Sequence, residues 1–403
     1  MRLRTIVPTL ALLLAAGLLL ALPGGGVAQT KTVKIGMSLP ITGADADSAD
    51  AIRKGAEMAI EEINQKGGAG GYKFEAVVYD SATPAAGQYD PAQAATNYKK
   101  FVADNAVIAA VGPIMSGEGK AISPILSEAD MATVTSSSTN PDITDPKFKD
   151  QYRPKGKAVY FRTVTTDAYQ GPNMANHAYH KLNVRKVYVL DDSGAFGVGI
   201  ADSFSRRAKE LGMTILGRDQ LNPKEADYKT ILTKIKGMSP DAVYYGGVQQ
   251  AGVKLARQAY EVMPKVHKLG SDGLYDLAFP EQAGKEAAEG WWASNASPDM
   301  LDDPKAKEWI NKFKSKFKRD PTNYAITSYN AVLAIADSVE RIAKSGKPVT
   351  KTAVREALEK TDLKNTLQGP ISFDENGDIK TKIVALYQVK DGKFKYVGVA
   401  PEK

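Results

Sequence analysis

Short apolar runs alternate with longer amphipathic segments along most of the chain. Runs rich in Val, Ile, Tyr and Ala, bounded by Gly, Asp or Asn, predict strands at 33–39, 74–80, 107–111, 132–135, 159–164, 187–190, 214–221 and 242–245. Apolar residues at helical spacing, such as Ala56, Ile60 and Ile63, predict helices at 52–66, 92–104, 119–129, 171–182, 199–211, 228–236 and 253–263. Such alternation is typical of parallel sheets covered on both faces.

The strand–helix order occurs once before about residue 164 and again after it. We therefore expect an α/β fold of two doubly wound parallel-sheet lobes, joined by a multi-strand hinge. The last hundred residues differ, with predicted helices at 305–317, 328–343 and 351–358 and then strands at 371–373, 383–389 and 393–397. We assign 31–164 and 294–372 to an N-terminal lobe, and 165–293 and 373–403 to a C-terminal lobe.

The first residues have the three-part pattern of a secretory signal peptide. Arg2 and Arg4 precede an apolar run at 6–22, and small residues lead to Ala28. A membrane anchor is the alternative, but the run is at the short limit for spanning a bilayer. The pattern predicts a signal peptide at 1–28 and export to the periplasm.

Composition narrows the class of protein further. Of 403 residues, 43% are hydrophobic and 25% charged, as in soluble globular proteins. The absence of cysteine excludes disulfides, a thiol nucleophile and a zinc–thiolate site. The net charge of +7 comes from lysines that are spread out among acids, so we expect no nucleic-acid partner. A monomer is expected.

Two stretches end an apolar strand in a cluster of uncharged hydrogen-bonding groups. "AAVGPIMSGEG" leads into Ser116 at the start of a helix, and "MATVTSSSTNP" leads into Ser137, Ser138 and Thr139. A helix N-terminus with an adjacent serine can hold a carboxylate without a cationic side chain. The alternative is that these hydroxyls merely cap helices and turns.

An acid follows a short strand in the second half of the chain. "KLGSDGLYD" places Asp272 after a strand ending at Leu269. At the carboxyl end of a strand and facing a cleft, this carboxylate could hold an ammonium group. A solvated loop aspartate is the alternative.

Several segments together resemble one known family. "VKIGMSLPITG", "GAEMAIEEINQKGG", "VYDSATPAAG", "TSSSTNPDIT", "AYQGPNMA", "PDAVYYGG" and "GPISFDENGDIK" occur in family order over essentially the whole chain after the signal peptide. They are similar to the leucine/isoleucine/valine-binding proteins, the periplasmic solute-binding proteins of ABC importers. The resemblance implies the type I periplasmic-binding fold, closure of the two lobes on an amino acid, and an ABC permease in the inner membrane as partner.

The resemblance also implies residue roles. The ligand carboxylate would contact Ser116 and Thr139, and the ammonium would contact a carbonyl near Ser137, the same Thr139, and Asp272. The family's best-known members carry Glu at the position of Asp272, so the reach is shorter here.

The positions implied for the ligand side chain depart from the family. Phe196 and Val248 stand where those members carry Tyr, and Ser48 lies near a first-loop aromatic. The first loop brings Asp45, Asp47 and Asp50 instead of aromatic cover. Tyr169, with Asp167, is a further candidate contact from the second lobe.

We therefore expect a solute-binding protein of an ABC importer, for a branched-chain or other apolar amino acid. The same fold binding an aromatic carboxylic acid or small amide is an alternative; an exported α/β hydrolase is an alternative of another class. We expect no enzymatic activity, no cofactor and no metal, since His177 and His180 lack an evident third ligand.

Overall fold

The computed structural model describes residues 31–402. The predicted signal peptide at 1–28 lies outside the described residues. Between residues 31 and 402, no helix combines the length and apolar character needed to cross a membrane.

The first half of the described chain forms a parallel five-stranded sheet. Its strand order is β2-β1-β3-β4-β5, with the bounds β1 Lys31–Leu39, β2 Tyr72–Asp80, β3 Val107–Val111, β4 Thr133–Thr135 and β5 Tyr160–Arg162. Every pairing within this sheet is parallel. The inner strand β3 is buried at every position, as expected for a parallel sheet with both faces covered.

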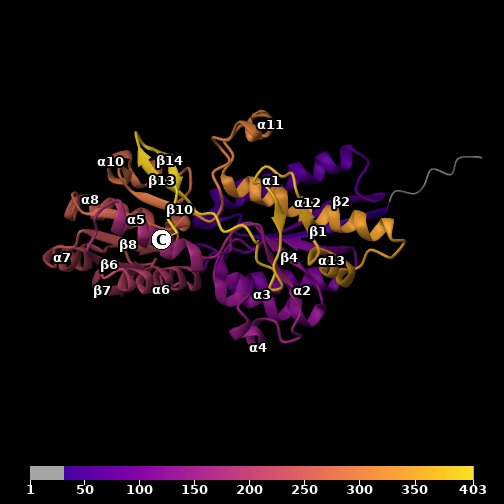
Figure 1. Cartoon of the computed structure of the whole chain (residues 1–403), viewed down its shortest axis with the longest axis horizontal. Helices are drawn as coiled ribbons and strands as arrows, with labels where there is room; N and C mark the ends of the chain where they lie inside the picture. The colour runs from indigo at the N-terminus through magenta and orange to yellow at the C-terminus, as the bar shows by residue number, and fades with distance from the viewer. Residues whose placement is uncertain (1–30, 403) are drawn as a thin grey trace, which may run out of the picture. The chain divides into compact units, whose positions relative to one another are not determined.

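Helices cover the two faces of this sheet. One face packs against α1 (Ala46–Gln65), α12 (Asn323–Lys344) and α13 (Lys351–Leu358), where Ile35, Ile52 and Ile335 belong to one apolar cluster. The other face packs against α2 (Pro91–Ala103) and α3 (Ser116–Ala129) through Tyr98 and Ile122. Figure 1 shows these elements together on the right.

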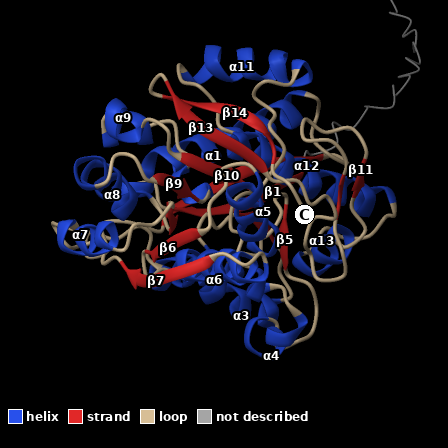
Figure 2. Ribbon diagram, turned by 60° about the vertical axis from the view of Figure 1, so that its left-hand side comes forward, coloured by secondary structure: helices blue, strands red, loops and turns tan. Residues whose placement is uncertain are grey.

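The second sheet repeats the strand order of the first. Its order is β14-β13-β10-β9-β8-β6-β7, with the bounds β6 Lys186–Asp191, β7 Thr214–Gln220, β8 Ala242–Gly246, β9 His267–Gly270, β10 Trp292–Asn295, β13 Ala385–Lys390 and β14 Lys393–Val399. Strands β6 to β10 are parallel, whereas β13 and β14 add an antiparallel edge. The strands are drawn in red in Figure 2.

Helices also cover the second sheet on both faces. α5 (Asp167–His180) and α6 (Ala195–Glu210) pack on one side around Phe204. α7 (Lys229–Gly237), α8 (Gln249–Val262), α9 (Phe279–Ala283) and α10 (Lys285–Ala288) lie on the side whose apolar cluster includes Leu255 and Trp291. The predicted α/β class with two doubly wound parallel sheets is thus confirmed.

The chain crosses between the two sheets after β5, after β10 and before β13. Two of these crossings are hydrogen-bonded to each other, because the Thr165 N–H donates to the Ala296 carbonyl at 2.8 Å. The sequence pattern assigns the residues after 372 to the C-terminal lobe, whereas Phe373 and Ile379 belong to the apolar cluster of the first sheet. The segment that follows β12 (Ile371–Ser372) therefore packs with the first lobe for several residues more.

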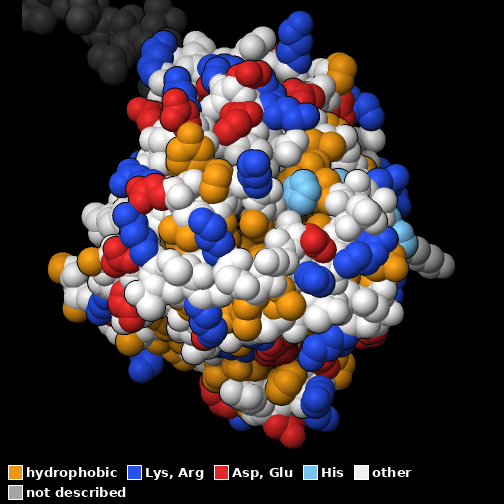
Figure 3. Space-filling model, turned by 90° about the vertical axis from the view of Figure 1, so that its left-hand side faces the viewer, with side chains coloured by type: hydrophobic (Ala, Val, Ile, Leu, Met, Phe, Trp, Pro, Cys, Tyr) orange, Lys and Arg blue, Asp and Glu red, His pale blue; other side chains and the backbone are white. Residues whose placement is uncertain are grey.

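Smaller elements complete the fold: α4 (Lys149–Tyr152), α11 (Lys307–Phe317) and the strand β11 (Asp362–Leu363), which pairs with β12. On the face shown in Figure 3, Lys and Arg side chains are interspersed with Asp and Glu. That face carries mixed charge rather than a basic stripe.

The strand order predicts where in each sheet a ligand site lies, namely at the carboxyl ends of the strands that flank the switch point. In the order 2-1-3-4-5, the chain changes direction between the first and third strands, so loops leaving their carboxyl ends diverge and leave a crevice. β1 and β3 flank this point in the first sheet, and β6 and β8 flank it in the second. A ligand site is expected beyond these strand ends.

Candidate functional site: a cavity between the two sheets

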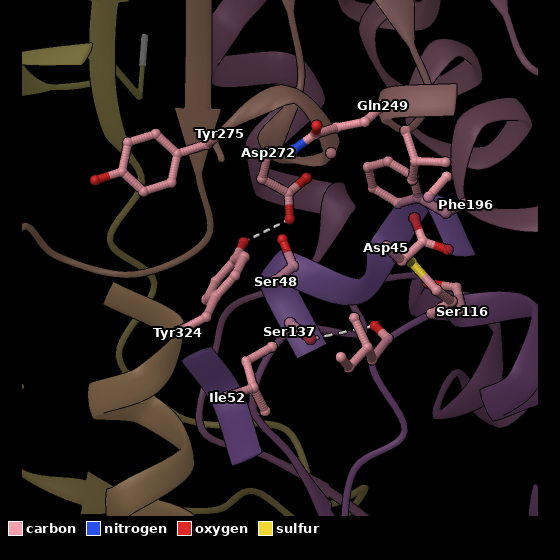
Figure 4. A pocket seen from close by; sticks show the side chains of 15 residues that line it. Asp45, Ser48, Ile52, Ser116, Ser137, Phe196, Gln249, Asp272, Tyr275 and Tyr324 are labelled. Atoms are coloured by element: carbon pink, nitrogen blue, oxygen red, sulfur yellow. Dashed lines mark hydrogen bonds between the residues drawn. The ribbon is translucent and has the colours of Figure 1, made fainter. Parts of the chain in front are cut away.

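One cavity collects the loops that leave the carboxyl ends of both sheets. Its lining comes from the segments after β1, β3, β4, β6, β8 and β9 and from α12: Ala44, Asp45, Ser48, Ile52, Ile114, Met115, Ser116, Ser137, Phe196, Val248, Gln249, Asp272, Gly273, Tyr275 and Tyr324. Figure 4 shows these side chains from close by. The switch points of the two sheets thus open into a shared space.

The cavity is small. The space open to the centre of a water-sized sphere is about 50 Å³, which is roughly four times what a single water needs. That is room for a small organic molecule. Gly273 contributes to the shape, because a Cβ there would lie 2.2 Å from the Gly247 carbonyl oxygen.

Ser116 is the first residue of α3, directly after the loop that leaves β3. Its Oγ accepts the Asn140 N–H at 3.1 Å and lies 3.4 Å from the Ser138 Oγ. The hydroxyl proton of Ser116 thus remains available to a group in the cavity. The helix start adds backbone N–H groups that favour negative charge.

Hydrogen bonds with neighbouring side chains hold the second hydroxyl cluster, Ser137 to Thr139, in place. The Thr135 Oγ1 accepts the N–H groups of Ser137 and Ser138. Arg162, which is fully buried, donates to the carbonyls of Ser138 (2.6 Å) and Asn140 (2.8 Å). These bonds fix the turn after β4 in one conformation.

The turn divides the predicted hydroxyls between two environments. Ser137 lines the cavity, although its Oγ also donates to the Ile114 carbonyl at 3.2 Å. Ser138 and Thr139 are buried and are not among the lining residues. The Thr139 hydroxyl instead lies beside the Asp167 carboxyl.

Asp272 begins a short 3-10 turn after β9 and faces the cavity. Its carboxylate accepts the Gln170 amide at 3.0 Å and the Tyr324 hydroxyl at 2.5 Å. Burial raises the pKa of Asp272 to about 6. Two neutral donors therefore hold this acid, and its net charge is not compensated by a cation in these contacts.

A second buried acid lies behind Asp272. Gln170 also donates to Asp167 at 3.1 Å, and its own carbonyl accepts the Ser294 hydroxyl at 2.8 Å. Burial, followed by the nearby charge of Asp272, raises the pKa of Asp167 well above its usual range. The network positions Asp272 while Asp167 itself stays outside the cavity lining.

The opposite part of the cavity is mainly apolar. Phe196, at the start of α6, and Val248, just before α8, pack in one cluster together with Met115 from the first sheet's side. Ser48 lines the cavity and donates its hydroxyl to Asp276. Ser48, Phe196 and Val248, which the sequence assigns to the ligand's side chain, thus all line the same cavity.

Tyr169 lies elsewhere. It is 38% exposed and sits inside α5 rather than in a loop, and the Lys382 ammonium lies 5.4 Å from its ring centre. It does not line the cavity. The helix begins at Asp167, four residues earlier than predicted, which turns Tyr169 outward.

His177, one of the two histidines considered for a metal, is buried against Trp292 with 4.4 Å between ring centres. Burial lowers its pKa to about 4. Its contacts are those of a core side chain.

Several lining residues were missed from the sequence: Asp45, Gln249, Tyr275 and Tyr324. Tyr324 is near the start of α12 and contacts Asp272, 52 residues away. No local motif marks such a residue. Asp45 did have a signal, since it belongs to the acidic first loop whose role the sequence left open.

This arrangement, in which two doubly wound sheets share one small cavity lined by polar and apolar side chains, defines a two-lobed binding protein. The family model described as periplasmic binding protein matches residues 32–393. Leu/Ile/Val-binding protein homolog 3 of Brucella melitensis is 31% identical over 90% of this chain and 92% of its own. The leucine-, isoleucine-, valine-, threonine- and alanine-binding protein of Pseudomonas aeruginosa is 31% identical over 89% of this chain and 90% of its own.

Solved structures agree with this fold. The leucine-binding protein LivK from Thermotoga maritima superposes with a TM-score of 0.79 at 26% identity, covering 91% of this chain and 98% of its own. The branched-chain amino acid transporter substrate-binding protein LivJ from Streptococcus pneumoniae, in complex with isoleucine, gives 0.79 at 25% identity, covering 92% and 99%. The chain belongs to the periplasmic binding protein family, in its Leu/Ile/Val-binding group.

Proposed function

We propose that this protein is the periplasmic solute-binding component of an ABC importer and that its ligand is a small α-amino acid of the branched-chain class. The relatives named above are binding proteins for such amino acids. The similar Streptococcus pneumoniae protein was solved with isoleucine.

The observation that carries the proposal is the pairing of Ser116 and Asp272 across one small cavity. A hydroxyl at a helix N-terminus stabilises a carboxylate, and a buried carboxylate stabilises an ammonium. The two groups come from different sheets, so a zwitterion that contacts both favours the closed arrangement of the lobes.

The same geometry disfavours the alternative ligands. Asp272 and Asp45 both face the cavity, and two carboxylates would repel a ligand that is only an anion, such as an aromatic acid. A space of about 50 Å³ also suits a short aliphatic side chain better than a large ring. An amide offers no positive charge to Asp272.

Direct contacts across the cavity support closure. The Tyr324 hydroxyl from the first lobe donates to Asp272 of the second, and the Asn140 amide donates to the Ala195 carbonyl at 2.9 Å. We infer that these bonds form as the lobes close and break as they open. The inner-membrane permease would receive the ligand from the open form, and the protein would act as a monomer.

Isothermal titration calorimetry on the mature protein tests the proposal, with leucine, isoleucine and valine compared against benzoate and a small amide. Ligand at a hundred times its dissociation constant should add about 2.7 kcal/mol to the unfolding free energy. NMR of the released ligand should show it unchanged, whereas a hydrolase would convert it. Binding of benzoate but of no amino acid would contradict the proposal.

A further inference from the structure

The acidic first loop contains two kinds of aspartate. Asp47 and Asp50 both accept hydrogen bonds from Arg319, at 3.0 and 2.8 Å. Asp50 also accepts Lys54 and Arg53; although burial acts to raise the pKa of Asp50, the hydrogen bonds from Lys54, Arg319 and Arg53 lower it below the usual range. These two acids are accounted for by the ion pairs that join α1 to the segment after α11.

Asp45 differs from both. It is 5% exposed, lines the cavity, and receives one hydrogen bond in the described chain, from the Tyr89 N–H to its Oδ2 at 3.1 Å. Its Oδ1 has no hydrogen-bond donor among residues 31–402. Figure 4 draws Asp45 toward Phe196 and Ser116, on the side of the cavity away from Tyr324.

The groups around Asp45 do not neutralise it. Burial raises its pKa to about 6, and the charges of Asp192 and Asp276 act in the same direction. The oxygens of those two neighbours are occupied: Asp192 accepts the N–H groups of Gly194 and Val248, and Asp276 accepts Ala278 N–H and the Ser48 hydroxyl. Only Asp45 offers a free acceptor to the cavity among these three acids.

A carboxylate oxygen that faces the cavity without a donor from the protein can accept a hydrogen bond from a ligand, and a bond to a charged group contributes more than one between neutral groups. A site built around such a group discriminates strongly against an analogue that lacks the donor. Phe196 and Val248, which cluster with Tyr89 on the side of Asp45, line this small cavity and leave space for a short side chain only.

We propose that Asp45 determines ligand specificity by accepting a hydrogen bond from the ligand's side chain, so that α-amino acids with a short hydroxyl- or amine-bearing side chain bind more tightly than purely aliphatic ones. This inference rests on the proposed amino-acid function and extends its substrate class from aliphatic to short polar side chains. Threonine and valine are the matched pair that isolates the effect, because they share a β-branched shape and differ in one hydroxyl.

Calorimetric titration of the wild-type protein with threonine and with valine is the first test. A hydrogen bond to a charged group predicts about tenfold or tighter binding of threonine. Asp45→Ala should bring the two affinities to within about threefold of each other. The control is Asp47→Ala, which removes an acid of the same loop that pairs with Arg319 outside the cavity lining and should keep the wild-type ratio.

The ratio of the threonine and valine affinities in the wild type tests the role of Asp45 even if Asp45→Ala does not fold. Asp45→Asn, which keeps an oxygen for the Tyr89 N–H, then serves as the second variant and should lower the ratio severalfold. If the wild type binds valine as tightly as threonine, the role of Asp45 is refuted while the amino-acid function stands. If no amino acid binds, the proposed function fails and this inference fails with it.

Discussion

Replacing Asp272 by asparagine is the most direct probe of how the cavity holds its ligand. The substitution removes one negative charge but keeps the size of the side chain. Its oxygen can still accept from Gln170, and its amide can donate to the Tyr324 oxygen. The network around the site is therefore retained, and the change acts mainly on the ammonium of the ligand.

The magnitude follows from the chemistry of that contact. A hydrogen bond to a charged group contributes about 1.5–3 kcal/mol. Its loss should raise the dissociation constant of an amino acid about 10- to 150-fold. The 2-hydroxy analogue of the same acid has no ammonium, so its affinity should change much less.

Asp192→Asn is the matched control for this measurement. Asp192 and Asp272 are both 6% exposed and both lie in the second lobe, but Asp192 accepts backbone N–H groups and does not line the cavity. Calorimetry on the three proteins with both ligands separates charge recognition from general destabilisation. Equal losses for the amino acid and its hydroxy analogue in Asp272→Asn would refute the ammonium contact.

The pH dependence gives a second check on the same residue. Because the pKa of Asp272 is raised to about 6, the carboxylate becomes protonated as pH falls through 6. Affinity for a zwitterion should therefore decrease between about pH 7 and pH 5. In Asp272→Asn this part of the pH dependence should disappear.

Three further predictions concern the surroundings of the site. Burial raises the pKa of Glu118 to about 8, so the folded state holds the Glu118 proton more tightly than the unfolded state does. The unfolding free energy should therefore fall from about pH 5 to pH 8. In urea titrations, Glu118→Gln should flatten that fall. Ser116→Ala should weaken amino-acid binding about tenfold or more. It should also lower the unfolding free energy by about 1 kcal/mol, because the Ser116 Oγ accepts the Asn140 N–H. Unchanged affinity in calorimetry would exclude the carboxylate contact. Arg162→Met should cost about 3–5 kcal/mol in urea unfolding, because it removes the cationic partner of Asp378 and leaves two buried carbonyls without the Arg162 donor. A loss below about 1 kcal/mol would show that the turn after β4 holds without Arg162.

Local sequence patterns predicted most of the framework. Continuous apolar runs such as 107–111 identify buried parallel strands, and β3 has the same bounds in the structure. Helix starts were less well predicted: α1 begins at Ala46 rather than residue 52, because its first turn contains polar residues and alanine instead of an apolar repeat. β10 was missed, since four residues are too few to show a period.

The candidate site was predictable where a strand end carries its own chemistry. Ser137 and Asp272 follow a strand within two residues, Ser116 begins the helix after the β3 loop, and all three line the cavity. Ser138 and Thr139 follow the same strand as Ser137 but are turned into the protein, because the bonds from Arg162 and Thr135 set the direction of the turn. Neighbours in sequence need not share a surface.

The sequence alone therefore determined the fold class, the repetition of the strand–helix series and the residue types that follow each strand. These features depend on periodicity and on short-range backbone preferences. Only the tertiary structure decided which side chains meet. Tyr324 contacts Asp272 because two sheets with their helices bring α12 and β9 together, and Asp45 faces the cavity while Asp47 pairs with Arg319. Those contacts arise from packing between segments far apart in the chain, which no local pattern encodes.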